Sequence, residues 1–594
     1  MKKNTLQKAV ATALVGAMAV STLAGCNNSS DTNSTTATSK QDETTTQAPS
    51  TEGNTQETTT QAASSSDSTG TAGIDGWEPF AEKVTLEIPV YDRGSSGNGC
   101  ADVENNYWTQ WVQENFGNKY NIDVKYVGIT RSDVMTDYSL LAAADSLPTI
   151  CMEYDYDKLA TWQSEGYIKP YDVEEFKQIA PTYWKQMTDY GNDAYTKLAD
   201  EDYLVLGYRP YGNTTYTFVT FYRQDWLEEA GFDAYPTTNT ELLELYAKLV
   251  ENGHDAPLGG TKVSGAGIDQ NYGYRDYPQD EETWATTGDY QIPALSTEAQ
   301  KRFLKWQNEL YNDGYLNKEY YLRESSEAEA DFVNGKSFTW SGYVSSTMNV
   351  LNSFYETNPD GKLAVITSPS TWAQDETWGS SPSYRPGTNF GMMIGFSKDD
   401  TDDEMKAAMM YLEWLVQPEN LFTMQWGIEG VNFNYDENGT PVAVADQSGL
   451  AEQQGHNNNV DYWCAVTAIK TLGDIEKDIA AIAPQGLPQD FYDELLANYN
   501  GQLALANAGY ANSDCLFAVS LDSVAEYNQT LYSLYTEYRD ELTMCKPEEF
   551  DALYDELSQK YLDAGYQEVI DERKAAFEAG NTTQIGRASC RERV

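Results

Sequence analysis

The sequence predicts an α/β protein built as two globular halves. With both chain ends set aside, about 510 residues remain, enough for two sizeable hydrophobic cores rather than one. Short apolar runs typical of buried strands alternate with helical stretches, beginning with strand 84–90, helix 107–116, strand 122–126 and helix 132–144. A glycine-rich loop, 94–99, follows the first strand, at the edge where open α/β sheets bind ligands. The loop lacks the Gly-Lys-Ser/Thr ending of a phosphate loop, so it does not indicate a nucleotide site.

The N-terminal segment, 1–25, has the pattern of an export signal. Lys2 and Lys3 precede an apolar run, 9–24, that is too short to span a bilayer permanently. The following Leu-Ala-Gly-Cys resembles the bacterial lipobox, which implies cleavage after residue 25 and acylation of Cys26. An ordinary secretory signal that ends near a cysteine is the alternative. Because two acyl chains anchor a protein where one does not, we expect a lipid-anchored protein on the extracellular face of a Gram-positive cytoplasmic membrane.

Both flanking segments are excluded from the fold. Residues 26–73 consist mostly of Ser, Thr, Gln, Asp, Glu, Ala and Gly and contain no aromatic residue, so they are expected to form a disordered stalk. The last ten residues, 585–594, are basic, unlike the acidic chain before them. They match a translated sequencing-adapter sequence, and we interpret them as an artefact.

The composition restricts the partners. A net charge of −53 repels phosphate backbones, so no nucleic-acid partner is expected. The seven cysteines are scattered and lack Cys-x-x-Cys spacing, so they predict neither a zinc site nor a disulfide framework. A single disulfide bridge is left as an alternative. No cofactor motif is present, and neither a cofactor nor a metal ion is expected. The 43 tyrosines and 14 tryptophans suit sugar binding, because pyranose faces stack on aromatic rings.

The stretch 389–441 has the clearest local pattern. An apolar run punctuated by glycines, 390–396, suits a buried strand. The acidic turn 399–403 places carboxylates where a helix dipole favours them, and apolar residues then recur at helical spacing up to Pro418. The turn 436–439 is predicted as a hairpin rather than a calcium loop, because the bidentate glutamate at the twelfth position is missing.

Motifs along the chain resemble those of a known family. The strongest lie within 389–433: Gly-Phe-Ser-Lys at the strand end, Leu-Glu-Trp-Leu in the helix and Trp-Gly-Ile-Glu-Gly-Val-Asn-Phe after it. Weaker ones are Asp-Ser-Leu-Pro-Thr-Ile at 145–150, Gly-Tyr-Ile-Lys-Pro-Tyr-Asp at 166–172, Arg-Gln-Asp-Trp-Leu at 223–227 and Phe-Val-Asn-Gly-Lys at 332–336. On these motifs the chain resembles extracellular solute-binding protein family 1, in the Gram-positive lipoprotein subgroup that serves carbohydrate ABC importers. In the motif at 145–150, Thr149 stands where this family usually has an aspartate.

The resemblance implies a two-lobed, periplasmic-binding-protein-like fold of type II, with a mixed sheet flanked by helices in each lobe. Two strands, 215–222 and 389–396, are expected to cross side by side between the lobes with few other connections. Gly387, Gly391 and Gly395 would absorb the backbone rotation of closing. The expected segments are lobe one at 74–214, lobe two at 215–386, the return of lobe one at 387–445 and a helical C-terminal region at 446–584.

Candidate ligand-binding residues lie at predicted strand ends and in aromatic loops. They are Asp92, Arg93, Glu153, Tyr154, Tyr208, Arg209, Trp284, Trp340, Tyr343, Trp378, Tyr384, Arg385 and Trp426. For Glu153 and Tyr154 a solvated loop is the alternative, and for Trp340 a place in the core. Arg385 has three interpretations: a hydrogen-bond donor to hydroxyl groups, a partner of an acidic sugar, or a cap on the hinge.

The resemblance implies a monomeric binding protein that captures an oligosaccharide and delivers it to the permease subunits of an ABC importer. Closing is a population shift, so the ligand must contact both lobes. A secreted polysaccharide-degrading enzyme is the first alternative, and it needs two carboxylates at a fixed separation. A surface lectin without an importer is the second. Among the 92 acidic residues no single pair stands out, and the lack of a nucleophile elbow or metal motif counts against a hydrolase. On the resemblance, the protein is predicted not to be an enzyme.

Overall fold

The computed structural model describes residues 74–92, 102–212, 214, 218–236, 238–262, 281–287, 292–344, 347–366, 388–444, 460–483, 486–508 and 515–583. All of them belong to one structural unit, Ser68–Val594. The predicted alternation of strands and helices is confirmed over most of this length, with element ends that shift by a few residues.

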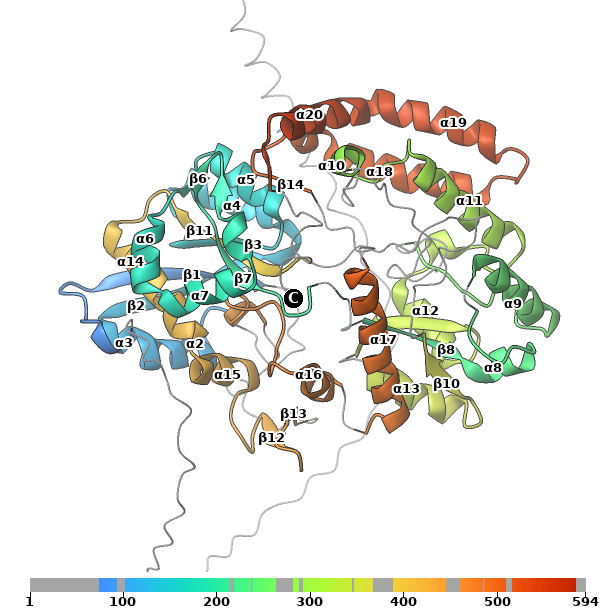
Figure 1. Ribbon diagram of the computed structural model, residues 1–594, viewed down its shortest axis with the longest axis horizontal. Helices are drawn as coiled ribbons and strands as arrows, with labels where there is room; N and C mark the ends of the chain where they lie inside the picture. The colour runs from blue at the N-terminus through green and yellow to red at the C-terminus, as the bar shows by residue number, and fades with distance from the viewer. Residues whose placement is uncertain are drawn as a thin grey trace, which may run out of the picture. The chain divides into compact units, whose positions relative to one another are not determined.

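The first sheet region contains the N-terminal strands and the strand predicted at 390–396 (Figure 1). Strands β1 (Val84–Asp92) and β2 (Ile122–Thr130) pair in parallel along their whole length. Strand β11 (Phe390–Ser397) is buried throughout and pairs antiparallel with β3 (Ile150–Glu153), β4 (Ile168–Lys169) and β7 (Val205–Tyr208). Strand β1 also contacts β3, and near their carboxyl ends the Tyr91 hydroxyl donates to the Glu153 carboxylate at 3.0 Å.

Helices surround this region and bury apolar residues in one cluster, which we call core one. They are α2 (Tyr107–Val112), α3 (Asn118–Tyr120), α4 (Val134–Ala143), α5 (Tyr156–Ser164), α6 (Val173–Ile179), α7 (Pro181–Asp189), α14 (Asp402–Val416) and α15 (Pro418–Trp426). Helix α14 begins as the acidic turn predicted, with a capping box in which Thr401 and Glu404 bond each other's backbone N–H groups. Pro418 ends the pattern and occupies the first turn of α15.

The second sheet has β8 (Phe218–Arg223) in the centre, antiparallel to both β9 (Thr339–Tyr343) and β10 (Leu363–Val365). Side chains alternate between its two faces. One face joins core two with α8 (Gln224–Glu229), α9 (Asn239–Glu251) and α11 (Glu298–Asn312). The other joins core three with α12 (Ser325–Val333), α13 (Thr347–Thr357), α16 (Ile475–Ile482) and α17 (Gln489–Asn507).

The last helices form core four. They are α18 (Asp522–Met544), α19 (Phe550–Tyr561) and α20 (Gln567–Glu578), and they pack with α10 (Glu281–Thr287) and α11. Short pairs of strands complete the described structure: β5 (Lys197–Leu198) with β6 (Glu201–Asp202), β12 (Phe433–Tyr435) with β13 (Pro441–Ala443), and β14 (Leu516–Phe517) with β15 (Thr582–Thr583).

The segment 446–584, expected to be one helical region, contributes to three different cores. Residues 462–466 lie in core one, α16 and α17 pack in core three, and α18 to α20 form core four. Helical periodicity identified the helices but gave no information about their partners, which are distant in sequence. The chain therefore passes between core one and core three again at 467–474, in addition to the two crossings predicted.

The prediction that the two crossing strands run side by side is wrong. Strand β8 pairs with β9 and β10, whereas β11 pairs with β3, β4 and β7, so the two belong to different sheets. The segments next to these strands meet instead: the Arg209 N–H donates to the Asn389 carbonyl at 2.8 Å. Gly387 lies outside the described residues. Gly391 and Gly395 have no positive φ, and each faces a close neighbour, Ala468 and Ile168 respectively.

Gly391→Ala is expected to lower the free energy of unfolding by about 1–3 kcal/mol, the usual cost of overpacking. The added Cβ would lie 2.6 Å from the Cβ of Ala468. Adding Ala468→Gly should restore part of the stability, because it removes the nearest atom. Urea denaturation of the two single variants and the double variant measures this coupling.

Gly76→Ala is the matched control, because no atom lies within 4 Å of its added Cβ. Its stability should equal that of the wild type. Strictly additive effects of Gly391→Ala and Ala468→Gly would show that close approach is not the reason for glycine in β11.

Candidate functional site

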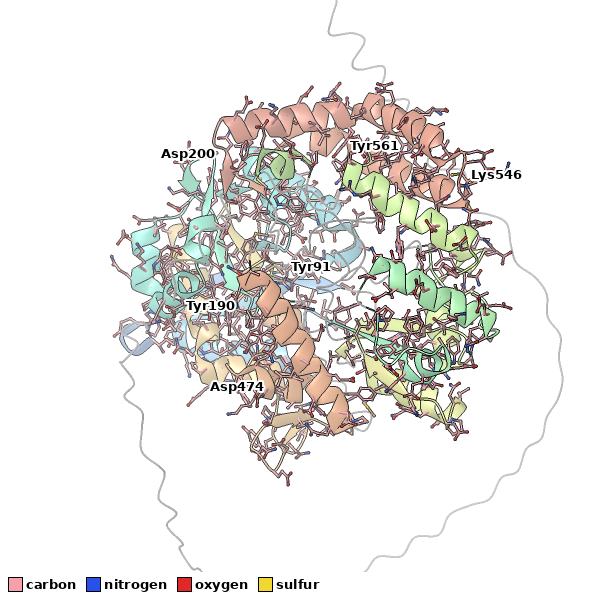
Figure 2. All side chains as sticks on the ribbon, turned by 45° about the vertical axis from the view of Figure 1, so that its right-hand side comes forward. Tyr91, Tyr190, Asp200, Asp474, Lys546 and Tyr561 are labelled. Atoms are coloured by element: carbon pink, nitrogen blue, oxygen red, sulfur yellow. The ribbon has the colours of Figure 1, made fainter. Side chains whose placement is uncertain are left out.

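Charged and aromatic residues gather at the carboxyl ends of the first-sheet strands. Tyr91, which Figure 2 labels, is near the end of β1. Arg131 follows β2, Glu153 ends β3, and Tyr154 and Lys158 come next. We call these five residues the strand-end cluster. Parallel strands place their carboxyl ends at one edge of a sheet, and ligands of open α/β sheets bind there.

Glu153 is the centre of this cluster. Its side chain is 1% exposed and accepts hydrogen bonds from the Tyr91 hydroxyl at 3.0 Å and the Tyr154 N–H at 2.8 Å. The Arg131 guanidinium and the Lys158 ammonium each lie 3.6 Å from one carboxylate oxygen. The buried carboxylate therefore supports its neighbours and offers no exposed surface to a ligand. Two cations share its single negative charge.

Arg131 bridges the two tyrosine rings of the cluster. Its guanidinium carbon lies 4.8 Å from the centre of the Tyr91 ring and 5.8 Å from that of Tyr154. Such contacts orient a cation over an aromatic face. Burial, and then the charge of Glu153, raise the pKa of the Tyr91 hydroxyl, which therefore stays protonated. About a third of the Arg131 side chain is exposed.

Arg209 lies within electrostatic range of predicted site residues from both sheets. It follows β7, and its Nε donates to the Phe390 carbonyl at 3.3 Å. Burial lowers the pKa of the guanidinium, and Tyr154 and Tyr343 oppose that shift electrostatically. Tyr154 follows β3, and Tyr343 ends β9 of the second sheet. A ligand that reached both tyrosines would contact both sheets, as a closing binding site requires.

Tyr343 and Trp340 share strand β9 but have different surroundings. Tyr343 is 62% exposed and contacts the Phe218 ring edge to face, with 5.3 Å between ring centres. Trp340 is half-buried and stacks on Phe221 and Phe332 at the margin of core three. Tyr343 is thus the more accessible of the two rings.

The remaining predicted residues do not join this group. Tyr208 is buried with its ring 4.5 Å from that of Tyr190, which Figure 2 labels. Trp426 is 3% exposed and packs among Phe422, Phe433 and Lys470, so neither ring presents a free face. Trp284 belongs to α10, a helix that packs on α20. Asp92 is exposed at the end of β1. Cys26, Arg93, Trp378, Tyr384 and Arg385 lie outside the described residues.

Sequence reasoning missed Tyr91, Arg131 and Lys158. The strand predicted at 122–126 runs on to Thr130 because it pairs with all of β1. With the longer strand, Arg131 becomes the residue directly after a ligand-facing strand end. The parallel pairing was the missing signal, since the residues 127–130 by themselves do not alternate clearly.

The structure also tests the metal prediction at 436–439. This turn joins β12 to β13, and the Asp436 carboxylate accepts hydrogen bonds from the N–H groups of Asn438 and Thr440. The predicted hairpin is confirmed. Within the described ranges, His, Cys, Asp and Glu side chains form no group of three or more able to hold a metal ion.

Among the helices described, none has the length and apolar character needed to cross a bilayer.

Comparison with known proteins identifies the class. Residues 111–446, more than half of the chain, match the family model of the bacterial extracellular solute-binding protein. The chain belongs to this family, whose members are extracellular binding proteins, and the predicted class is confirmed.

A particular curated relative is the polygalacturonan/rhamnogalacturonan-binding protein YtcQ of Bacillus subtilis (strain 168). It is 23% identical over 229 residues, and the match covers 37% of this chain and 43% of YtcQ. The matched region is thus less than half of that relative's length.

Solved structures share the fold over nearly their whole length. The alginate-binding protein AlgQ2 has a TM-score of 0.55 at 15% identity, with 85% of this chain and 99% of AlgQ2 covered. The Streptococcus pneumoniae ABC-transporter substrate-binding protein FusA, in complex with kestose, has a TM-score of 0.54 at 14% identity, with 84% and 99% covered. An extracellular solute-binding protein from Bifidobacterium longum subsp. infantis has a TM-score of 0.53 at 13% identity, with 85% and 100% covered. The two-lobed solute-binding fold predicted from the sequence is confirmed.

Proposed function

We propose that this protein captures an extracellular oligosaccharide and delivers it to the permease subunits of an ABC importer, without chemically changing it. The observation that carries the proposal is the place of Arg209, which is held against β11 by its bond to the Phe390 carbonyl and lies within electrostatic range of Tyr154 after β3 and Tyr343 at the end of β9. An aromatic ring and a guanidinium are the groups that a sugar needs, one for the pyranose face and one for the hydroxyl or acidic substituents.

The relatives support a carbohydrate as the ligand. YtcQ is described as binding polygalacturonan and rhamnogalacturonan, AlgQ2 as binding alginate, and FusA was solved with kestose. Since a ligand held by Tyr154 and Tyr343 touches both sheets, its binding favours the arrangement in which the two approach each other. We infer that the protein acts as a monomer that docks on the permease in this closed state.

Calorimetric titration and thermal unfolding with a panel of plant and host oligosaccharides test the proposal. A binding protein should bind one of them stoichiometrically, with a raised unfolding midpoint and no new reducing ends. Release of reducing ends would identify a polysaccharide-degrading enzyme. If none of the oligosaccharides in the panel binds, the proposal is contradicted.

Tyr343→Ala is expected to weaken binding of the identified oligosaccharide by roughly three- to tenfold. This corresponds to the loss of about 0.5–1.5 kcal/mol of aromatic contact. Tyr532→Ala, at a similarly exposed tyrosine of α18, is the matched control and should bind normally. An affinity of Tyr343→Ala equal to that of the control would remove Tyr343 from the site.

We further infer that Cys26 carries the lipid anchor, because Leu-Ala-Gly-Cys follows the apolar run of the export signal. Cys26→Ala should release the protein into the medium or leave it unprocessed, since no other acylation site is proposed. Fractionation of cells with an immunoblot measures both outcomes. Processed Cys26→Ala protein in the membrane fraction would exclude lipid anchoring at this cysteine.

A further inference from the structure

Arg209 carries its charge without an acidic partner. The chain has 92 acidic and 39 basic Lys and Arg residues, so carboxylates are plentiful. Four other described arginines form ion pairs with carboxylates. The pairs are Arg131 with Glu153, Arg223 with Asp225, Arg323 with Asp331 and Arg539 with Asp540. Within the described part of the chain, Arg209 forms no such pair. A half-buried guanidinium without an acidic partner in the described chain can take an anionic partner from outside the chain.

The guanidinium of Arg209 is held in one orientation. Its Nε donates to the Phe390 carbonyl at 3.3 Å, and its own N–H donates to Asn389 at 2.8 Å. No described residue accepts a hydrogen bond from its two terminal nitrogens. With Nε engaged, the end of the guanidinium keeps two parallel N–H groups, which match the two oxygens of a carboxylate.

The surroundings of Arg209 include aromatic side chains and a second cation. Tyr154 and Tyr343 act electrostatically on the Arg209 guanidinium, and Arg131 lies 5.8 Å from the centre of the Tyr154 ring. Arg131 shares the buried Glu153 carboxylate with Lys158, each at 3.6 Å, and about a third of the Arg131 side chain is exposed.

We propose that the terminal N–H groups of Arg209 bind the carboxylate of an acidic sugar, a uronate residue within the captured oligosaccharide. This inference rests on the proposed function and specifies its substrate class. The rings of Tyr154 and Tyr343 would contact the sugar ring while the guanidinium neutralises its charge.

Two matched ligands test whether the carboxylate charge or the sugar ring determines the affinity. An oligogalacturonide and its fully methyl-esterified form share the same pyranose rings and differ in the carboxylate charge. In calorimetric titration, the full-length wild type should bind the acid form at least tenfold more tightly than the ester. Salt should weaken binding of the acid form only.

Variants then assign the preference to Arg209. Arg209→Gln should weaken binding of the acid form 10- to 100-fold and binding of the ester by a smaller factor, so that the preference for the acid form is lost. Arg209→Lys keeps the positive charge but loses the two parallel N–H groups of the guanidinium. We therefore expect its affinity for the acid form to lie between those of the wild type and Arg209→Gln. Lys185→Gln, at an exposed lysine of α7 that pairs with Asp189, is the control for charge removal and should bind as the wild type does. Unfolding midpoints verify that each variant is folded.

The outcomes distinguish this inference from the proposed function. Equal wild-type affinities for the acid and the ester, or binding of neutral oligosaccharides alone, would overturn the acidic class and leave sugar capture standing. An acid preference that survives in Arg209→Gln would overturn the role of Arg209. If neither form nor any neutral oligosaccharide binds, the proposed function fails and this inference fails with it.

Discussion

Glu153→Gln is expected to lower the free energy of unfolding by about 2–3 kcal/mol, because it removes one partner of a buried charge cluster. The variant leaves Arg131 and Lys158 without their shared carboxylate. The new amide also presents an N–H group where an acceptor is needed by Tyr91 or Tyr154. The expected loss is below that of a fully buried pair, since about a third of each cation is exposed. Urea denaturation near neutral pH measures it.

Glu87→Gln is the matched control for that experiment. Glu87 lies in β1 and pairs with Lys125 at 3.9 Å, with both side chains substantially exposed. An exposed pair of this kind contributes little, so a change of less than about 0.5 kcal/mol is expected. If Glu153→Gln were as mild as Glu87→Gln, the buried carboxylate would not organise the strand-end cluster.

Asp400→Asn is expected to stabilise the protein above pH 4, with an effect that grows towards pH 8. Asp400 lies between β11 and α14, and one of its carboxylate oxygens is buried without a hydrogen-bond partner in the described structure. Lys169 donates to the Asp400 carbonyl rather than to the carboxylate. Burial, partly offset by the charge of Lys169, raises the pKa of Asp400 to about 8.

The sign of this effect follows from the raised pKa. In the unfolded chain the carboxyl titrates near its usual pKa of about 4, so between pH 4 and pH 8 the folded state holds a proton that the unfolded state has lost. Wild-type stability should therefore fall as pH rises through this window and change little below pH 4. Because an asparagine does not titrate, the variant should gain up to about 5 kcal/mol over the wild type at pH 8, roughly half of that at pH 6 and little at pH 4.

Chemical denaturation at pH 4, 6 and 8 checks this expectation. Asp403→Asn, at an exposed carboxylate in the first turn of α14, is the control. It should lose up to about 0.5 kcal/mol at pH 6 and 8, because the helix dipole favours the charge there. A difference between Asp400→Asn and the wild type that is constant from pH 4 to pH 8 would contradict the buried, protonated state.

The sequence by itself determined the local elements. The acidic turn 399–403 at the start of a helix, the helical spacing before Pro418 and the turn at 436–439 are each read within a few positions, and the structure has them as predicted. These signals are short-range: a cap bonds the first helical turn, and a hairpin turn bonds itself. The motifs of 389–433 also sufficed to identify the solute-binding class.

Only the tertiary structure decided which elements lie together. Glu153 was predicted to contact a ligand, yet its carboxylate is buried by Arg131 and Lys158, which come from a different strand end and a helix. The glycine of β11 at Gly391 was assigned to a hinge, yet Ala468, 77 positions further along, occupies the space of a side chain. Periodicity specifies which face of an element is apolar, but not the distant segment that covers it. Partners of buried charges and of close backbone contacts therefore follow from strand pairing and packing, which no local pattern contains.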